Sequence, residues 1–373
     1  MQKTLENLSL VNLNNYLYLG VDTHKDQHTI VGMNCFYQII YQKEITNSEE
    51  NFKQLVKEVE RIKDNRSLQP VFGLENTSSY GARLAQYLYL RGFLVKTVSP
   101  VLVERERRYQ THPEKSDSQD ASGVAKALIQ RIGKLPSFSI SKTEEIANEI
   151  KELVVDREFL VKEQTRLKNQ LHRLLHKAYN SQYRARFKNP FSGRALRYWL
   201  KSSLKLDSLL LKNQVRRKVK RLMDIKNEVK EIEEELRILV GQTGQKIETL
   251  NGCGLVLAAC LLAEIKNIDR FRSADALAKY GGFCPREKSS GKKIKHIKTK
   301  AGNRKLNKAI HRIALSQIGR NGNIYSKTYF KKKISEGKSK AQALCCLKRR
   351  LVDIIFMMLK YREEYSYSEE ILT

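Results

Sequence analysis

Apolar and polar positions divide the first third of the chain into short strands and amphipathic helices. The first apolar run, residues 16–22 (YLYLGVD), carries no charge before its last residue, Asp22. A run of this kind predicts a strand buried on both faces of a mixed or parallel sheet. Segments 28–33 and 35–45 are also apolar and predict two more strands in antiparallel succession.

Helical and strand patterns then alternate. Residues 48–63 have apolar side chains at helical spacing, and the short apolar run 70–74 ends directly before Glu75. Segments 78–91 and 93–98 predict a helix and a strand. The resulting order of three strands, helix, strand, helix, strand is that of a ribonuclease H-type sheet, and two of its strands end in an acid.

A further pair of acids begins the helical pattern at 115–121 (KSDSQDA). Asp117 and Asp120 are three residues apart, so they share one helix face. Helix capping and pairing with the helix dipole are the plainer explanation of such a pair on its own, and Asp22 alone could cap the turn after it. The two strand-end acids favour a common site instead. Four carboxylates in one place repel one another unless divalent cations, Mg²⁺ or Mn²⁺, neutralise them, and two such ions about 4 Å apart can position a phosphodiester.

The middle of the chain has the apolar period of long helices. Leu153, Leu160, Leu167 and Leu174 recur every seven residues, and a second seam runs through residues 222–239. This pattern predicts two long helices with a coiled-coil seam, which form a hairpin or pair with a second subunit.

The same region is strongly basic. Between Arg157 and Arg221 there are 19 basic residues and three acidic ones. Aromatic residues are interleaved with them: Tyr179, Tyr183, Phe187, Phe191, Tyr198 and Trp199. Cations suit a phosphate backbone and rings suit unstacked bases, so the pattern favours RNA binding. The alternative is a solvated helix face whose apolar side is packed.

Two glycine-containing stretches carry the remaining candidate chemistry. Gly252 and Gly254 precede an apolar helix, a form typical of a helix-hairpin-helix contact to a DNA backbone, although a buried helix with a flexible entry is the alternative. Ser290 lies in a second stretch, GGFCPREKSSGKK, and residues 286–350 include 21 basic residues and two acidic ones. Cations favour a serine alkoxide and neutralise a phosphate under attack. A flexible basic loop that touches DNA is the plainer interpretation.

Charge is distributed unevenly along the 373 residues. Lysine and arginine number 70 against 40 acidic residues, a net charge of +30, but residues 1–135 hold 18 basic and 15 acidic residues, which leaves +27 for the remainder. This surplus favours nucleic acid as the partner. No apolar run approaches the roughly 20 residues of a membrane-spanning helix. Six cysteines without zinc spacing favour reduced thiols, no structural metal and a cytoplasmic location.

Taken in order, five stretches resemble one family. They are GVDTHK around Asp22, GLENTSSY around Glu75, KSDSQDA, the GCG helix entry and GGFCPREKSSGKK. Together they are similar to the DEDD transposases of bacterial insertion sequences, relatives of the Piv-type DNA invertases. The likeness spans almost the whole chain. One departure is Ser79, which stands where a glycine before the tyrosine is usual.

The resemblance implies a fold of the class α/β plus α. Its parts are a RuvC-like, ribonuclease H-like mixed-sheet domain at 1–135, coiled-coil and RNA-binding or oligomerisation helices at 142–241, a mainly helical transposase domain at 245–362, and a tail at 363–373. Asp22, Glu75, Asp117 and Asp120 would hold Mg²⁺ or Mn²⁺, and Ser290, favoured over Ser289, would attack DNA. The candidate nucleic-acid contacts are Gly252, Gly254, Lys292, Lys293, Lys295, Lys298 and Arg304.

Partners follow from the same resemblance. They are donor and target DNA, a structured guide (bridge) RNA encoded by the element, and further copies of the chain, as dimers that form a tetramer; the location is cytoplasmic and nucleoid-associated, with no membrane. The leading hypothesis is a bridge-RNA-guided recombinase that cuts and rejoins DNA through a phosphoserine intermediate. The rival is a RuvC-like, structure-specific DNA nuclease that uses water, and a third is a non-catalytic nucleic-acid-binding protein.

Overall fold

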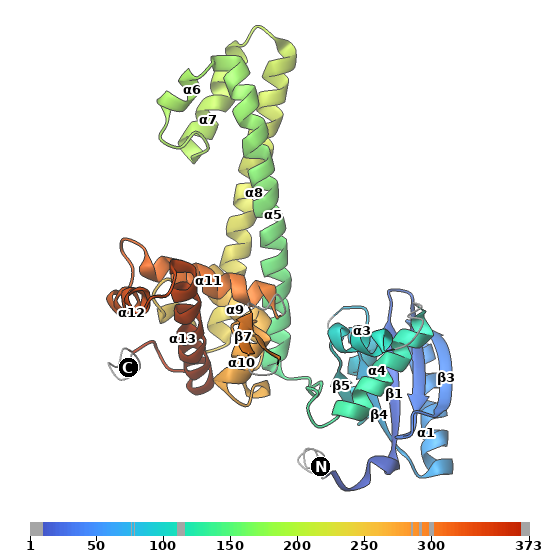
Figure 1. Ribbon diagram of the computed structural model, residues 1–373. Coiled ribbons are helices and arrows are strands. Elements are labelled where there is room, and N and C mark those ends of the chain that lie inside the picture. The colour runs from blue at the N-terminus through green and yellow to red at the C-terminus, as the bar shows by residue number, and fades with distance from the viewer. Residues whose placement is uncertain are drawn as a thin grey trace. The chain divides into compact units, whose positions relative to one another are not determined.

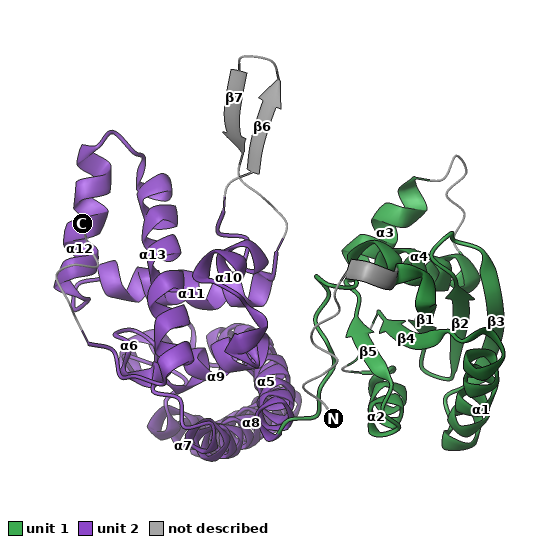
Figure 2. Ribbon diagram, turned by 90° about the horizontal axis from the view of Figure 1, so that it is seen from below, with its two compact units in different colours: residues 1–141 green, residues 142–373 purple. Residues whose placement is uncertain are grey.

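The chain separates into two compact units in the computed structural model, residues 1–141 and residues 142–373, called here the N-terminal unit and the C-terminal unit (Figure 2). The residues described are 10–75, 77, 79–109, 116–284, 286–290, 293–297 and 302–366, and only the backbone is described at 10–12, 286–290 and 293–297.

A five-stranded mixed sheet forms the centre of the N-terminal unit. Its strands are β1 (Tyr16–Thr23), β2 (Gln27–Met33), β3 (Ile39–Thr46), β4 (Gln69–Leu74) and β5 (Leu94–Thr97). They lie in the order β3-β2-β1-β4-β5, with β2 antiparallel to β1 and β3, and with β4 parallel to β1 and β5. The structure confirms the mixed α/β sheet and the order of its strands and helices.

Helices cover both faces of this sheet. They are α1 (Glu49–Arg66), α2 (Ala82–Leu90), α3 (Pro100–Arg108) and α4 (Asp117–Arg131). Figure 2 shows α1 and α2 on one face, and α3 and α4 on the other. Leu17 and Leu19 of β1 pack in the core beneath α1 and α2, whereas Tyr18 packs with side chains of α4. Because every residue from 17 to 23 is buried, β1 is the two-sided central strand that its uncharged sequence predicts.

Two long helices, α5 (Lys142–Tyr179) and α8 (Leu209–Gln242), run side by side through the C-terminal unit (Figure 1). Buried leucine, isoleucine and valine side chains line the contact along both helices. Arg157 of α5 forms an ion pair with Glu233 of α8 at 2.7 Å. The predicted helical hairpin is therefore present within one chain, while supercoiling and pairing with a second subunit remain predictions.

A small aromatic core holds the far end of the hairpin. The elements there are α6 (Gln182–Arg186), α7 (Gly193–Ser202) and the 3₁₀ turn η3 (Ser203–Lys205) (Figure 1). Tyr183 and Trp199 are each 1% exposed, Phe191 is 6% exposed, and Trp199 Nε1 donates to Pro190 O at 2.9 Å. The prediction that these three rings stack on bases is wrong, because the same rings supply the apolar area that attaches this end to α5 and α8.

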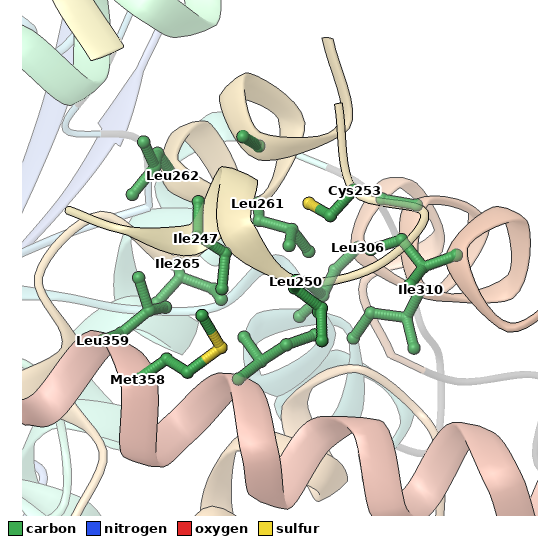
Figure 3. Close-up of a cluster of buried hydrophobic side chains, with 14 of the residues drawn as sticks. Ile247, Leu250, Cys253, Leu261, Leu262, Ile265, Leu306, Ile310, Met358 and Leu359 are labelled. Carbon is green, nitrogen blue, oxygen red and sulfur yellow. The ribbon is translucent and has the colours of Figure 1, made fainter. Parts of the chain in front are cut away.

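The rest of the C-terminal unit is a helical cluster around α9. Its helices are α9 (Leu255–Ile265), α10 (Ala274–Tyr280), α11 (Arg304–Ile318), α12 (Ile324–Ser335) and α13 (Lys340–Tyr361). Figure 3 shows Leu261 and Ile265 of α9 in a buried cluster that includes Leu306 of α11 and Met358 of α13. The mainly helical C-terminal region is confirmed.

One two-stranded hairpin interrupts these helices. Strands β6 (Arg286–Ser290) and β7 (Lys293–Ile297) pair antiparallel, with Ser290 opposite Lys293 at the end of the ladder. Short 3₁₀ turns complete the fold: η2 (Leu10–Asn15), η4 (Ile247–Thr249) and η5 (Ile268–Arg270). Within the described part of the chain, no helix combines the length and apolar character needed to cross a membrane.

Candidate active site

Two of the four predicted acids come from neighbouring parallel strands. Asp22 lies near the carboxyl end of β1, and Glu75 directly follows β4. Gly20 pairs with Gly73 across these strands, and the Glu75 amide donates to Val21 O at 3.5 Å. Because parallel strands point the same way, both carboxylates lie at the same edge of the sheet.

The other two acids arrive on α4, which lies very close to β1. A Cβ atom built on Gly20 would be 2.2 Å from Ala121 O and 2.3 Å from Ala125 N, so only glycine allows this approach. Side chains alternate along a strand, which puts Gly20 and Asp22 on the same face. The contact at Gly20 therefore brings the start of α4 towards Asp22.

Local sequence explains why α4 begins where it does. Ser116 is the N-cap, and its side-chain oxygen accepts from the Gln119 amide at 3.2 Å. Asp117 and Asp120 follow in the first turn, where the helix dipole favours negative charge. Asp120 is 9% exposed, while the side chain of Asp117 is 57% exposed.

A histidine joins the acids. The Nε2 atom of His24 lies 3.1 Å from an Asp22 oxygen and 3.4 Å from an Asp117 oxygen. Asp22, His24 and Asp117 each offer a ligand atom, and these atoms all lie within 4.8 Å of one another. Two carboxylates and an imidazole at this spacing form a donor set for a divalent cation.

An arginine sits beside the fourth acid. Arg107, at the end of α3, lies 3.3 Å from Asp120 Oδ1. That oxygen is buried, yet it has no hydrogen-bond partner among the described residues. Arg107 therefore partly balances a carboxylate that still has an unused acceptor.

The pKa values of two carboxyl groups reflect this crowding. Burial raises the pKa of Asp22, and the charges of Asp120 and Asp117 raise it further, against the lowering effect of His24. Burial likewise raises the pKa of Glu75, followed by the charges of Asp22 and Asp120, while Arg107 and His24 act in the opposite direction. The four acids thus share one electrostatic environment in the structure.

Sequence reasoning did not single out His24, Arg107 or Gly20. His24 left a signal, because it stands two residues after Asp22 and strand alternation brings positions i and i+2 to one side. Arg107 lies within ERERR, where nothing separates it from its basic neighbours. Gly20 is an unmarked residue of an apolar run, since the helix that packs on it lies about 100 residues further along the chain.

The predicted serine and basic residues of the C-terminal unit fall into three groups. Lys292 and Lys298 lie outside the described residues, and for Ser290, Lys293 and Lys295 only the backbone is described. Arg304 is the exposed first residue of α11.

The two glycines of the GCG sequence have distinct surroundings. Gly252 has a φ of +81°, and a Cβ there would be 2.9 Å from the Ser316 side chain, so turn geometry and packing already require glycine. Gly254 is the N-cap of α9, with nothing within 4 Å of its Cβ position. Contact of either glycine with nucleic acid stays a prediction.

Comparison with known families accounts for both units. A family model described as a transposase, of the DEDD type of IS110, matches residues 19–180, and a second, described as "Transposase IS116/IS110/IS902 family", matches residues 244–330. The first match contains all four acids, and the second contains the GCG sequence and β6–β7. The chain is thus a transposase by class.

Curated relatives narrow the assignment. The "Insertion element IS110 uncharacterized 43.6 kDa protein" of Streptomyces coelicolor is 24% identical over 396 residues, which cover 92% of this chain and 94% of the relative. The corresponding IS116 protein of Streptomyces clavuligerus is 31% identical over 137 residues, 36% of this chain and 33% of that protein. The protein belongs to the IS110 family of DEDD transposases.

One solved structure gives a weaker likeness. The structure described as "T. thermophilus RuvC in complex with Holliday junction substrate" aligns with 33% of this chain and 99% of its own, at 9% identity and a TM-score of 0.25. The mixed sheet is assigned from its own strand order and register.

Proposed function

We propose that this transposase cleaves DNA phosphodiester bonds at the edge of the N-terminal sheet, with divalent cations held by Asp22, Glu75, Asp117 and Asp120. The observation that carries the proposal is the cluster of Asp22, His24 and Asp117, whose ligand atoms lie within 4.8 Å of one another. Mg²⁺ is the cation we propose, with Mn²⁺ as the substitute.

The residues present fit a hard divalent cation. Carboxylate oxygens are its preferred ligands, and Asp120 Oδ1 is a buried oxygen without a hydrogen bond among the described residues. Burial and the neighbouring acids raise the pKa values of Asp22 and Glu75, so a positive charge at this place would lower the free energy of the site. When bound, the cations supply charge neutralisation at the phosphate and at its leaving oxygen.

The chain's own residues then orient the reaction. His24 Nε2 lies 3.1 Å from Asp22 and 3.4 Å from Asp117, where it would join their oxygens as a third ligand of the cation. Arg107, beside Asp120, offers a positive charge at the same edge of the sheet. In the simpler form of the proposal, water attacks the phosphate. All the residues involved then belong to the N-terminal unit.

A second form of the proposal uses Ser290 as the nucleophile. Ser290 is the last residue of β6 and pairs with Lys293, at the end of a two-stranded hairpin in a strongly basic segment. Its oxygen would displace one DNA strand end, giving a phosphoserine bond and a free hydroxyl that later reverses the step. This form retains the bond energy for rejoining strands and needs no ATP.

Donor DNA, target DNA and a structured guide RNA are the partners we propose. The charge of +30 supports a polyanionic partner. The guide RNA, and the assembly of dimers into a tetramer, rest on the family resemblance alone. With Tyr183, Phe191 and Trp199 buried, RNA binding by the hairpin region would depend on its basic side chains and not on these rings.

One experiment separates the two forms. The full-length protein is incubated with end-labelled element DNA and Mg²⁺, with and without RNA transcribed from the element, and products are resolved before and after protease digestion. Asp22→Asn is expected to abolish cleavage in both forms, whereas Asp26→Asn, an exposed acid on the following turn, should cut normally.

Serine variants give the second comparison. If water attacks, Ser290→Ala still cuts and no DNA remains attached to peptide. If Ser290 attacks, Ser290→Ala loses both cleavage and the covalent adduct, while Ser289→Ala retains them. Cleavage by Asp22→Asn at the unsubstituted rate would contradict both forms.

A further inference from the structure

Residues 280–282 and 302–303, called here the neck, flank the strands β6 and β7 in the sequence. Gly302 has a φ of +109°, and a Cβ there would lie 2.6 Å from the Gly282 amide nitrogen. The Asn303 amide donates to Tyr280 O at 2.7 Å. The two ends of the segment are therefore in direct backbone contact.

One asparagine links this neck to the helices below it. Asn303 Oδ1 accepts from the Leu306 amide at 2.9 Å and so caps α11, whose Leu306 is fully buried (Figure 3). Its Nδ2 donates to Glu264 Oε2 at 2.6 Å and lies 3.0 Å from the Tyr280 hydroxyl. A single side chain therefore ties α11, α10 and α9 together at the neck.

Glu264 is a carboxylate in an apolar core. It lies near the end of α9, is 9% exposed, and is surrounded by the buried cluster of the C-terminal unit. Burying a carboxylate costs free energy unless it is well hydrogen-bonded. Its backbone oxygen also accepts from Arg270 at 3.1 Å, and the Arg270 guanidinium stacks 4.8 Å from the centre of the Tyr280 ring. A leucine at this position would pack equally well. The Glu264 carboxylate therefore indicates that the orientation of its hydrogen-bond partner, Asn303, matters.

We propose that Glu264, Asn303 and Tyr280 are positioning residues, which hold the neck closed so that the β6–β7 segment meets DNA in one orientation. The inference rests on the proposed DNA cleavage, in the form in which Ser290 attacks the phosphate. In that form the segment carries the attacking group, and misplacing such a group by about an ångström can cost ~100-fold in rate.

The chain permits a test that breaks the clamp and keeps the helix cap. Asn303→Asp retains a good N-cap for α11, but it replaces the amide donor with a second carboxylate beside Glu264. Glu264→Gln retains an acceptor for Asn303. In the double variant Glu264→Gln with Asn303→Asp, the glutamine amide donates to the new carboxylate, which restores the contact with its polarity reversed.

Three readouts are measured on the full-length protein at a temperature below unfolding. They are kcat and KM for DNA cleavage with Mg²⁺, the Kd for the same DNA, and the rate of trypsin cleavage between residues 285 and 301. For Asn303→Asp we expect kcat to fall on the order of 100-fold, KM and Kd to stay within about twofold, and trypsin cleavage to become faster. Glu264→Gln and the double variant should resemble the unsubstituted protein in all three.

Control variants exclude a general loss of structure. Asn323 caps α12 as Asn303 caps α11, accepting from the Tyr325 and Ser326 amides, and Asn323→Asp is expected to change none of the readouts. Tyr280→Phe, a milder change at the neck, should lower kcat in the same direction as Asn303→Asp.

Each outcome decides the proposal. A normal kcat in Asn303→Asp, a double variant as impaired as Asn303→Asp, or a parallel loss of kcat, DNA affinity and unfolding temperature would overturn it. If the unsubstituted protein cuts no DNA with Mg²⁺, the proposed function fails separately. In that case the rate of trypsin cleavage alone tests whether Asn303 holds the neck closed. Equal cleavage rates in Asn303→Asp and the unsubstituted protein would reject that role.

Discussion

The acid site of the N-terminal unit and the neck of the C-terminal unit gather polar side chains in opposite ways. At the acid site, carboxylates crowd together, and Asp120 Oδ1 has an ion pair with Arg107 but no hydrogen-bond partner among the described residues. At the neck, the side chain of Asn303 uses both its donor and its acceptor. Native structures satisfy nearly all buried hydrogen-bonding groups, so clustered acids with an unused acceptor fit ligand binding, whereas a fully hydrogen-bonded network fits a structural role.

The stability of the two regions should respond differently to mutation. Removing a charge from the acid site relieves repulsion and costs function. Removing a polar atom from the neck leaves a partner without its hydrogen bond, which costs about 1–3 kcal/mol when the partner is buried. Four predictions test this contrast, from the largest effect to the smallest.

Asp22→Asn should have the largest effect on activity. Residues that only support metal ligands typically cost 10- to 100-fold when changed, so loss of a proposed ligand should lower the cleavage rate by ~100-fold or more. The same variant should unfold at a higher temperature without metal, because burial and nearby acids raise the pKa of Asp22 and make its charged form unfavourable. Cleavage assays and thermal unfolding in EDTA measure the two effects. An Asp22→Asn variant that is both inactive and less stable would show that Asp22 has stabilising partners in the folded protein, as the side chains of the neck have.

Gly20→Ala should have the largest effect on stability. The new Cβ would overlap Ala121 O and Ala125 N, both backbone atoms that cannot rotate away. Overpacking of this kind costs about 1–3 kcal/mol or more, and we expect the upper end, together with loss of cleavage, because α4 carries two of the acids. Denaturant unfolding followed by circular dichroism measures the change.

Two controls accompany Gly20→Ala. Gly133→Ala should be nearly neutral, since nothing lies within 4 Å of that Cβ position. The chain's single tryptophan, Trp199, lies in the C-terminal unit, so its fluorescence transition should move less than the signal from the whole chain. Equal unfolding curves for Gly20→Ala and Gly133→Ala would rule out a close contact between β1 and α4.

Sequence patterns anticipated the parts of the molecule that are encoded locally. The strand ends at Asp22 and Glu75 were readable because an uncharged run stops at an acid, and the strand order brought the two acids to one edge. The start of α4 was readable because serine and two acids form a capping pattern. The topology of the sheet then predicted that the end of β1, the end of β4 and the start of α4 lie close together.

Features that depend on tertiary contact were not readable. The pair of Asn303 and Glu264 joins positions 39 residues apart, and nothing at either position marks it. The rings around Trp199 were misinterpreted because cations beside aromatic residues do not reveal which side chains are buried. Gly20 matters only because α4 lies on it. Local pattern thus gives the elements and their ends, whereas close approach and burial require the folded chain.

Mg²⁺ should stabilise the protein through the acid site. A ligand at 100 times its Kd raises the free energy of unfolding by about 2.7 kcal/mol, so the unfolding temperature should rise with Mg²⁺ and reach a plateau. Asp117→Asn should reduce this shift, because Asp117 offers one of the clustered ligand atoms. Glu264→Gln, at the neck, should leave it unchanged. Equal shifts in all three proteins would place metal binding elsewhere, and differential scanning calorimetry distinguishes the outcomes without any DNA.

The smallest predicted effect is a pH dependence of the stability difference between Asp22→Asn and the unsubstituted protein. The pKa of Asp22 is raised above its usual 3.8 in the folded protein, so between these values the folded state binds more protons than the unfolded state. The unsubstituted protein therefore regains stability as pH falls through the folded pKa, whereas asparagine has no proton to bind. In EDTA, the advantage of Asp22→Asn should be greatest near pH 7 and shrink towards pH 4, and Asp26→Asn controls for the loss of one acidic charge. An advantage that grows on acidification would mean that Asp22 is stabilised in its charged form, as a carboxylate with a permanent partner would be.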